Sequence, residues 1–296
     1  MHDFPTELWL MIIPSACLDD GSTGRALGAV SRRIRAISHE YRYQSIAVTG
    51  SRQVQHLIDT LRHPDNVGCR VEALFVEAED TGLIIQLCSI VAPTVEILTI
   101  VTSDTPPESS TRSIDLYFPQ LRELTVRGFV ILSYQNTLAP ALERLELSSN
   151  ALSASRPFFN TSADNSPNLT YILVHYDEYA VWAQPHPPLL QLLSAAEINM
   201  RNNKASSPPL RILAFEFIPM VAQSLDVRQD RELLRARRMI QQEIKQHSRF
   251  VLLPEVASGS EVARERWLDR VQGKGGVWAL VQTKVRNNVH KVMNEV

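Results

Sequence analysis

The amino-acid sequence predicts an α/β solenoid, in which short strands stack in chain order behind an N-terminal helical module and in front of a C-terminal helical cap. Three observations predict this fold. An apolar triplet of one fixed spacing occurs six times between residues 71 and 215. A proline stands two residues before five of these six triplets. The first 50 residues show helical spacing of apolar residues and contain no such triplet.

The composition is that of an ordinary folded chain. It has 296 residues, 44% of them hydrophobic and 21% charged, which is enough to bury a sizeable core without disulfides or metals. A net charge of -2 and a pI near 6.5 argue against nucleic acid or an anionic membrane as a partner. Three widely spaced cysteines favour a reducing compartment, and neither a signal peptide nor an apolar run of roughly 20 residues is found. We therefore expect a cytoplasmic or nuclear protein.

Residues 1–50 are predicted to form a module of three helices. Pro5 suits the first turn of a helix, because the N–H that proline lacks has no helical partner there. Ser22 or Thr23 is expected to cap the second helix, and Pro14 is expected to stop or kink the first. The apolar residues of the three helices are, in order, Leu8, Met11 and Ile12, then Ala26, Leu27 and Val30, then Ile34 and Ile37.

Residues 51–220 carry the triplets and are predicted to form an irregular leucine-rich-repeat horseshoe. The stretch PALERLELSSN at 140–150 has the spacing L-x-x-L-x-L-x-x-N, which is typical of such repeats. Successive triplets begin 24, 26, 21, 27 and 41 residues apart, and the first four gaps match the roughly 20 to 29 residues of these repeats. Any α/β protein with six strands would also carry such triplets, but the recurrent proline favours a repeating unit. The triplets are Val71/Leu74/Val76, Val95/Leu98/Ile100, Leu121/Leu124/Val126, Leu142/Leu145/Leu147, Leu169/Ile172/Val174 and Leu210/Leu213/Phe215.

The segments between the triplets are predicted to include one clear helix and several loops. Between the first two triplets, apolar residues recur at helical spacing from Leu83 to Val91. The stretches 102–113, 151–166 and 201–209 are rich in Ser, Pro and Asn and are predicted to be surface loops. One repeat buries too little apolar surface to fold alone, so the copies are expected to stack and share a core.

Alternate residues of the strands are predicted to face solvent on the side opposite the triplets. They combine aromatic side chains with charges of both signs, as a protein-recognition face does. A plain solvated sheet face would have a similar composition, and that alternative stays open. The residues predicted to bind a target protein are Phe75, Glu77, Arg127, Arg144, Glu146, Tyr171, His175 and Glu216.

Residues 221–296 are predicted to form a C-terminal capping segment. Apolar residues at helical spacing predict a helix from Leu233 to Ile244, and RFVLLP at 249–254 predicts a strand. A further helix is predicted from Val262 to Val271, while the residues from Gln282 onward are either a basic helix or a frayed end. Arg235, Arg237 and Arg238 form a basic cluster that suits an acidic partner or simply a solvated helix face.

The N-terminal module resembles the F-box, and in particular the F-box of fungal proteins that carry leucine-rich-like repeats. The resemblance lies in Phe4-Pro5-x-Glu7-Leu8 with Ile12 and Ile13, in Ala26-Leu27-x-x-Val30-Ser31-Arg32-Arg33, and in YRYQSIAV at 41–48. In that family the three-helix F-box docks on a Skp-type adaptor of cullin-RING ubiquitin ligases, and the repeats hold the protein to be ubiquitinated. Ile34 departs from the family, which often has tryptophan at that position. The resemblance implies adaptor contacts by Pro5, Leu8, Ile12, Leu27, Val30 and Ile34.

Motifs of catalysis and of phosphate binding are not found. The chain lacks G-x-S-x-G, G-x-x-x-x-G-K-[ST], G-x-G-x-x-G and H-E-x-x-H. An enzyme would need a polar site, for which His175, Asp177 and His186 are the best candidates, but no cysteine stands near them at zinc spacing. Cys17 and Cys88 lie in apolar runs that would raise a thiol pKa. We therefore expect no enzymatic activity, no cofactor and no metal.

The sequence and the resemblance together predict a non-catalytic substrate-recognition subunit of an SCF-type cullin-RING ubiquitin ligase. Residues 1–50 would bind the Skp-type adaptor, and residues 51–220 would bind an unknown target protein. Catalysis would belong to the recruited conjugating enzyme, with this chain supplying proximity. The alternative is a leucine-rich-repeat interaction scaffold without a ligase role, in which the helical module only caps the first repeat.

Overall fold

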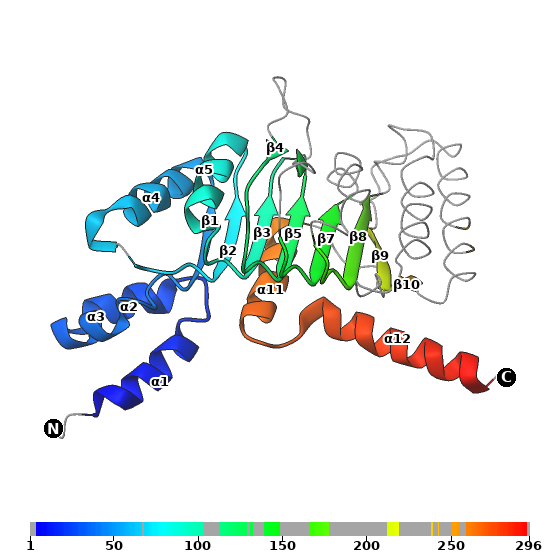
Figure 1. Cartoon of the computed structure of the whole chain (residues 1–296), viewed down its shortest axis with the longest axis horizontal. Coiled ribbons are helices and arrows are strands. Elements are labelled where there is room, and N and C mark those ends of the chain that lie inside the picture. The colour runs from blue at the N-terminus through cyan, green and yellow to red at the C-terminus, as the bar shows by residue number, and fades with distance from the viewer. Residues whose placement is uncertain are drawn as a thin grey trace.

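The computed structural model of the protein describes residues 4–66, 68–103, 113–128, 131–132, 139–148, 166–177, 212–218, 238, 242, 250–254 and 259–294. Within these residues the chain forms an open parallel β-sheet with helices on both of its faces and a group of three helices at its N-terminal edge (Figure 1). The α/β arrangement around a parallel sheet, which the sequence predicted, is confirmed.

The main sheet has eight parallel strands, and their order in space is their order in the chain. A separate sheet pairs β4 (Ser113–Ile114) with β6 (Ile131–Leu132). Because each crossover returns to the neighbouring position, the sheet grows in one direction from β1 to β10 and does not close. The strands of the main sheet are β1 (Ser45–Thr49), β2 (Ala73–Glu77), β3 (Ile97–Val101), β5 (Glu123–Arg127), β7 (Arg144–Ser148), β8 (Tyr171–Asp177), β9 (Ile212–Ile218) and β10 (Phe250–Leu252).

The predicted triplets lie side by side across this sheet. Leu74 pairs with Leu98, and the same register continues through Leu124, Leu145 and Ile172 to Leu213. The described side chains of this row, from Leu74 to Ile172, are at most 5% exposed. The six triplet segments are therefore neighbours in space, and their spacing in the sequence identified them correctly.

A repeated turn explains the recurrent proline. Pro119, Pro140 and Pro167 each lie in a turn that ends just before the next strand. The residue two positions later closes the turn in two of these cases, where the N–H of Leu142 donates to the Ala139 carbonyl and that of Leu169 to the Ser166 carbonyl. Proline fits inside such a turn because its missing N–H is not needed there and its fixed φ favours the bend.

Two helices cover the triplet face of the sheet. They are α4 (Ser51–Arg62) and α5 (Thr81–Val91), and their buried residues join one core with the triplets. Helix α5 begins where the Asp80 carboxylate accepts hydrogen bonds from the N–H groups of Gly82 and Leu83 at 2.8 and 3.2 Å. A short 3-10 helix, η1 (Pro64–Asn66), follows α4.

The opposite face of the sheet is covered by the C-terminal helix α11 (Ser260–Val271). Its Trp267 is 0% exposed and packs against Phe75 of β2, with ring centroids 5.9 Å apart. The strand at 249–254 and this helix were both predicted. However, α11 does not sit over the end of the sheet as a cap. It lies across the face instead, and α12 (Gly276–Asn294) follows it and packs beside β10, the last strand (Figure 1).

Parts of the predicted C-terminal capping segment lie outside the described residues. The helix predicted from 233 to 244 lies outside the described residues except for Arg238 and Gln242, which are helical. Two members of the basic cluster, Arg235 and Arg237, also lie outside them. The segment from Gln282 belongs to helix α12.

In the part of the chain that the structure describes, no helix has both the length and the apolar composition to cross a membrane.

The N-terminal module has the three predicted helices, α1 (Thr6–Ala16), α2 (Ser22–Val30) and α3 (Arg32–Ser38). Helix α1 continues past Pro14 to Ala16, so the helix does not stop at the proline. The cap of α2 also differs from the prediction, because the Asp19 carboxylate accepts from the N–H groups of Gly21 and Thr23 at 2.8 and 2.9 Å. Burial opposes ionisation of Asp19, but hydrogen bonds from the Thr23 and Ser22 hydroxyls, together with those from the two N–H groups, outweigh it and lower the pKa of Asp19.

The module is joined to the edge of the sheet by the Asp19–Gly21 turn. The Asp20 carbonyl accepts a hydrogen bond of 3.2 Å from the N–H of Ala47 in β1, and the Asp19 carbonyl accepts one from the Ser45 hydroxyl. A side chain at Gly24 would collide with the backbone carbonyl of Arg42, which is why this position of α2 needs a glycine. The module therefore covers the start of β1. Along the rest of β1, no other described strand pairs with the outer edge.

Candidate functional site

The N-terminal helices leave several large apolar side chains exposed. Helix α1 has 11 residues, and Ile13 is the one that is buried. Large exposed apolar areas mark sites of protein or membrane interaction, because a monomer gains stability by covering them. We call the following residues the N-terminal apolar surface, with their exposed fractions: Phe4 45%, Leu8 41%, Leu10 44%, Met11 73%, Ile12 48% and Val30 66%.

The six residues expected to contact an adaptor differ in exposure. Four are exposed and one is half-buried, in the order Pro5, Leu8, Ile12, Val30 and then Leu27. The sixth, Ile34, is only 8% exposed, and the expectation of an accessible contact is wrong for it. Ile34 and Ser38 are the buried residues of α3, because side chains four positions apart share the inward face of a helix.

The predicted target-binding face is largely buried. Phe75 and Glu146 are 0% exposed, and His175 and Glu216 are 2% exposed, so the expectation that these four side chains face solvent is wrong. The physical reason is helix α11, which covers this side of the sheet. Of the eight predicted residues, those that remain partly accessible are Glu77, Arg127, Arg144 and Tyr171.

Under α11 the strands place a charged network around His175. Its Nε2 atom lies 2.7 Å from Glu146 Oε1, and its Nδ1 atom lies 2.7 Å from Glu216 Oε2. Each ring nitrogen of His175 therefore faces a carboxylate, and an ionised carboxylate can only accept a hydrogen bond. Glu146 also accepts from Arg127 Nη2 at 3.0 Å, and Glu123 is paired with Arg144.

Helix α11 contributes two arginines to the same network. Arg266 binds Glu216 with two hydrogen bonds of 2.8 and 2.7 Å, the fork geometry that suits a carboxylate. Arg270, with a side chain 3% exposed, lies 3.5 Å from Glu123 and 3.6 Å from Glu146 and donates to the Thr125 hydroxyl at 2.9 Å. The network thus fastens the helix to the sheet.

Two carboxylates of the network, those of Glu146 and Glu216, stay ionised despite their burial. Burial opposes ionisation of Glu146, but the positive charges of His175, Arg270 and Arg127 outweigh it and hold the pKa well below its usual range. For Glu216, the hydrogen bonds and charges of His175 and Arg266 likewise outweigh burial and lower the pKa to about 2. Because every acid here has a close cation, the arrangement is suited to holding two elements together.

The structure also bears on the residues considered for chemistry. Both nitrogens of His175 are occupied by carboxylates, and His186 lies outside the described residues. Among the residues that the structure describes, no group of three or more His, Cys, Asp or Glu side chains is arranged to hold a metal ion. Burial raises the pKa of Cys88 to about 12 and also raises that of Cys17, as predicted for thiols in apolar surroundings.

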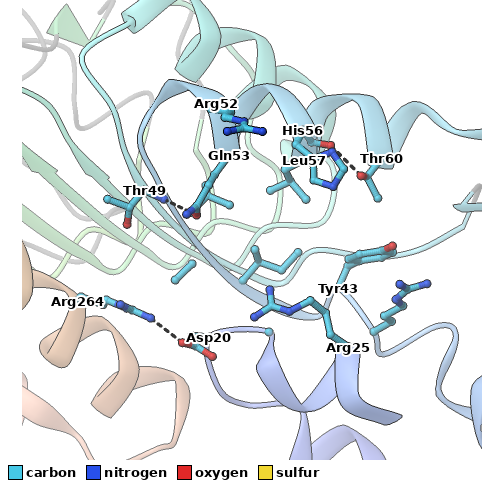
Figure 2. Close-up of a pocket in the computed structure, with 15 residues that line it drawn as sticks. Asp20, Arg25, Tyr43, Thr49, Arg52, Gln53, His56, Leu57, Thr60 and Arg264 are labelled. Atoms are coloured by element: carbon cyan, nitrogen blue, oxygen red, sulfur yellow. Dashed lines mark hydrogen bonds and ion pairs between the residues drawn. The ribbon is translucent and has the colours of Figure 1, made fainter. Parts of the chain in front are cut away.

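A pocket of about 1130 Å³ lies between the N-terminal module and α4, along the uncovered part of β1. Figure 2 shows Arg25 extending from α2 into the space below α4. His56 and Leu57 of α4 face Arg25 from the other side of this space. Helix α11 forms part of the wall through Arg264, whose guanidinium is 2.6 Å from the Asp20 carboxylate. No sequence pattern predicted this pocket, because its walls come from segments far apart in the chain.

Comparison with protein-family models, with curated proteins and with solved structures gives no match to this chain. The function is therefore inferred from the chain's own residues and their geometry.

Proposed function

We propose that this protein is a non-catalytic substrate-recognition subunit of an SCF-type cullin-RING ubiquitin ligase. In this proposal residues 1–50 are an F-box-like module that binds a Skp-type adaptor, and residues 51–220 are a leucine-rich-repeat-like solenoid that binds the target protein. Residues 221–296 form the C-terminal segment, which includes α11. The recruited conjugating enzyme would carry out the chemistry, and this chain would hold the target near it.

The observation that carries the proposal is the N-terminal apolar surface. Helix α1 presents Leu8, Met11 and Ile12 to solvent, and the module packs its own interior with other residues such as Ile13 and Ile34. A helix whose apolar side chains are this exposed is suited to lie in a groove of a partner, which then buries them. The position of these residues matches the F-box pattern in the sequence, and four of the six expected adaptor contacts are exposed.

The parallel strands support the solenoid part of the proposal. Consecutive strands pair in constant register, and a similar turn precedes several of them. Each unit buries its triplet against its neighbours, as repeats in a solenoid do. The target-binding role is proposed for the accessible residues Glu77, Arg127, Arg144 and Tyr171 and no longer for the four that α11 covers.

A co-purification experiment tests the adaptor contact. The full chain is co-expressed with a Skp-type adaptor and recovered by a tag on the chain, beside the double variant Leu8→Asp/Ile12→Asp. We expect the double variant to lose at least nine tenths of the adaptor, because two charges would be buried in an apolar interface. Leu280→Asp is the control, since Leu280 is 54% exposed on α12, outside the module.

The outcomes separate this proposal from its rival. If the wild-type chain recovers no adaptor, or if the double variant recovers as much as the Leu280 control, the ligase proposal is wrong. The interaction scaffold would then be favoured, because the module also covers the start of β1 through the Ala47 to Asp20 hydrogen bond. Circular dichroism of each variant shows whether the chain is still folded.

A further inference from the structure

The pocket between the module and α4 is unusually rich in arginine. Arg25 from α2, Arg42 from the segment before β1, Arg52 from α4 and Arg264 from α11 all line it, and Asp20 is the one acidic residue of the lining. Asp20 is already paired with Arg264. Positive charges gathered in a cleft attract an anionic ligand more strongly than the same charges spread over a surface.

The other three arginines have no carboxylate partner. Among the described residues, no ion pair joins Arg25, Arg42 or Arg52 to an Asp or Glu side chain, and the buried Nε of Arg42 has no hydrogen-bond partner. Elsewhere in the fold the buried arginines Arg266 and Arg270 are matched with carboxylates. The pocket therefore carries positive charge that the described part of the chain leaves uncompensated.

The size and the lining of the pocket favour an extended peptide over a small anion. A volume of about 1130 Å³ exceeds what an inorganic anion fills. The lining also contains the apolar side chains of Tyr43, Ile46 and Leu57, while Arg25 and Arg52 come from α2 and α4, which lie on opposite sides of the pocket. A peptide with alternating acidic and apolar residues would place its acids against the arginines and its apolar residues against these apolar side chains.

The edge of the sheet adds a second reason. Strand β1 is the first strand of the sheet, so one of its edges has no neighbouring strand. On that edge the N–H of Thr49 donates to the side-chain Oε1 of Gln53 at 3.1 Å, at the position where the carbonyl of an added strand would accept. An exposed side chain such as Gln53 is easily displaced, and an incoming peptide carbonyl can replace it.

We propose that this pocket binds an extended acidic segment of a partner protein, with its Asp or Glu carboxylates held by Arg25, Arg42 and Arg52. Nucleic acid fits less well, because the chain as a whole carries a net charge of -2. The inference rests on the proposed function only in identifying the partner as a ligase target. The binding itself depends on the pocket alone.

Fluorescence anisotropy on the full chain tests this binding without an adaptor. The probe is a fluorescein-labelled decapeptide of alternating glutamate and valine, and its counterpart has lysine in place of glutamate. We expect the glutamate peptide to bind at least ten times more tightly than the lysine peptide. The affinity for the glutamate peptide should also fall when the salt concentration rises from 50 to 300 mM, because salt screens partly exposed charges.

The double variant Arg25→Glu/Arg52→Glu tests the residues. Both side chains are exposed, so their reversal should leave the fold intact, and affinity for the glutamate peptide should fall at least tenfold. The matched control is Arg32→Glu/Arg70→Glu, which changes the net charge by the same amount at exposed positions outside the pocket and should bind as the wild type does.

Three results would overturn the inference. They are no preference for the glutamate peptide in the wild-type chain, equal loss in the pocket and control variants, or tighter binding of a ten-nucleotide single-stranded RNA than of the peptide. Adaptor recovery with the pocket variant is measured in parallel. Loss of peptide binding with normal adaptor recovery places the defect in the pocket, whereas failure of wild-type adaptor recovery concerns the ligase proposal alone.

Discussion

The two faces of the same sheet are stabilised in opposite ways. The triplet face is covered by α4 and α5 and buries Leu and Val side chains such as Leu145 and Val126, which need no polar partner. The other face is covered by α11 and buries Glu146, His175 and Glu216, each of which has a charged partner within 3.0 Å. The centres of both faces are buried, although their residues differ in chemistry.

This difference teaches that a polar strand face need not be a solvent face. Apolar contacts are non-directional and tolerate small shifts, whereas a buried charge is stable only with its partner in place. The α11 side of the sheet should therefore be the more sensitive to loss of a single group.

Removal of Arg270 should have the largest effect. The Arg270→Ala variant leaves Glu123 and Glu146 with one cation fewer in a buried site, and breaking a buried pair on one side typically costs about 3–5 kcal/mol. Urea unfolding followed by circular dichroism measures the loss. Arg264→Ala is the control on the same helix, since its pair with Asp20 is 48% and 32% exposed and should contribute less than about 1 kcal/mol. Equal losses in the two variants would show that burial of the network contributes nothing.

Acid should have the second-largest effect, because it weakens the α11 side of the sheet. The pKa of Glu216 is about 2 in the folded protein, against 4.5 as its ordinary value, so its ionised form stabilises the fold. Because the folded pKa is the lower one, this stability is fully present above pH 4.5 and is lost as the pH falls toward 2. The lost free energy of unfolding should be roughly 3 kcal/mol for this group.

Thermal unfolding between pH 6 and pH 2.5 measures this loss, with tryptophan fluorescence as a second signal because Trp267 of α11 is buried against Phe75 of the sheet. The matched variant Glu216→Gln removes the titrating group, and its unfolding should depend less steeply on pH. A variant with the same acid dependence as the wild type would exclude Glu216 as the source.

Local spacing predicted the triplet face well. The row from Leu74 to Ile172 was found because strand residues two positions apart share a face and the turn before each strand recurs. Helical spacing also placed Leu8 and Ile12 on one side of α1, since they are one turn apart, whereas their role as partner contacts was implied only by the F-box resemblance. In both cases the signal lies within a few residues of the chain.

The cover of the second face was not predicted, because alternation shows which residues share a face and not what lies on it. Trp267 reaches Phe75 from the far end of the chain. A signal did exist, since Ala263, Trp267 and Arg270 fall on one side of α11 and such a helix needs a surface to cover. The basic pocket had no comparable signal, because Arg25 and Arg52 belong to separate helices that the fold brings together.

The smallest effect is expected from exchanging one hydroxyl group between the two faces. Thr125 and Val126 are adjacent in β5 and both are 0% exposed, with Thr125 on the α11 side and Val126 among the triplets. In Thr125→Val the Arg270 guanidinium loses one hydrogen bond of 2.9 Å, which should cost about 1 kcal/mol. In Val126→Thr a hydroxyl of similar size enters an apolar core without a partner, and this should cost more, about 1–3 kcal/mol. Urea unfolding of the two variants under the same conditions measures both losses of free energy of unfolding. A larger loss for Thr125→Val than for Val126→Thr would contradict the proposed difference between the polar face under α11 and the apolar face under α4 and α5.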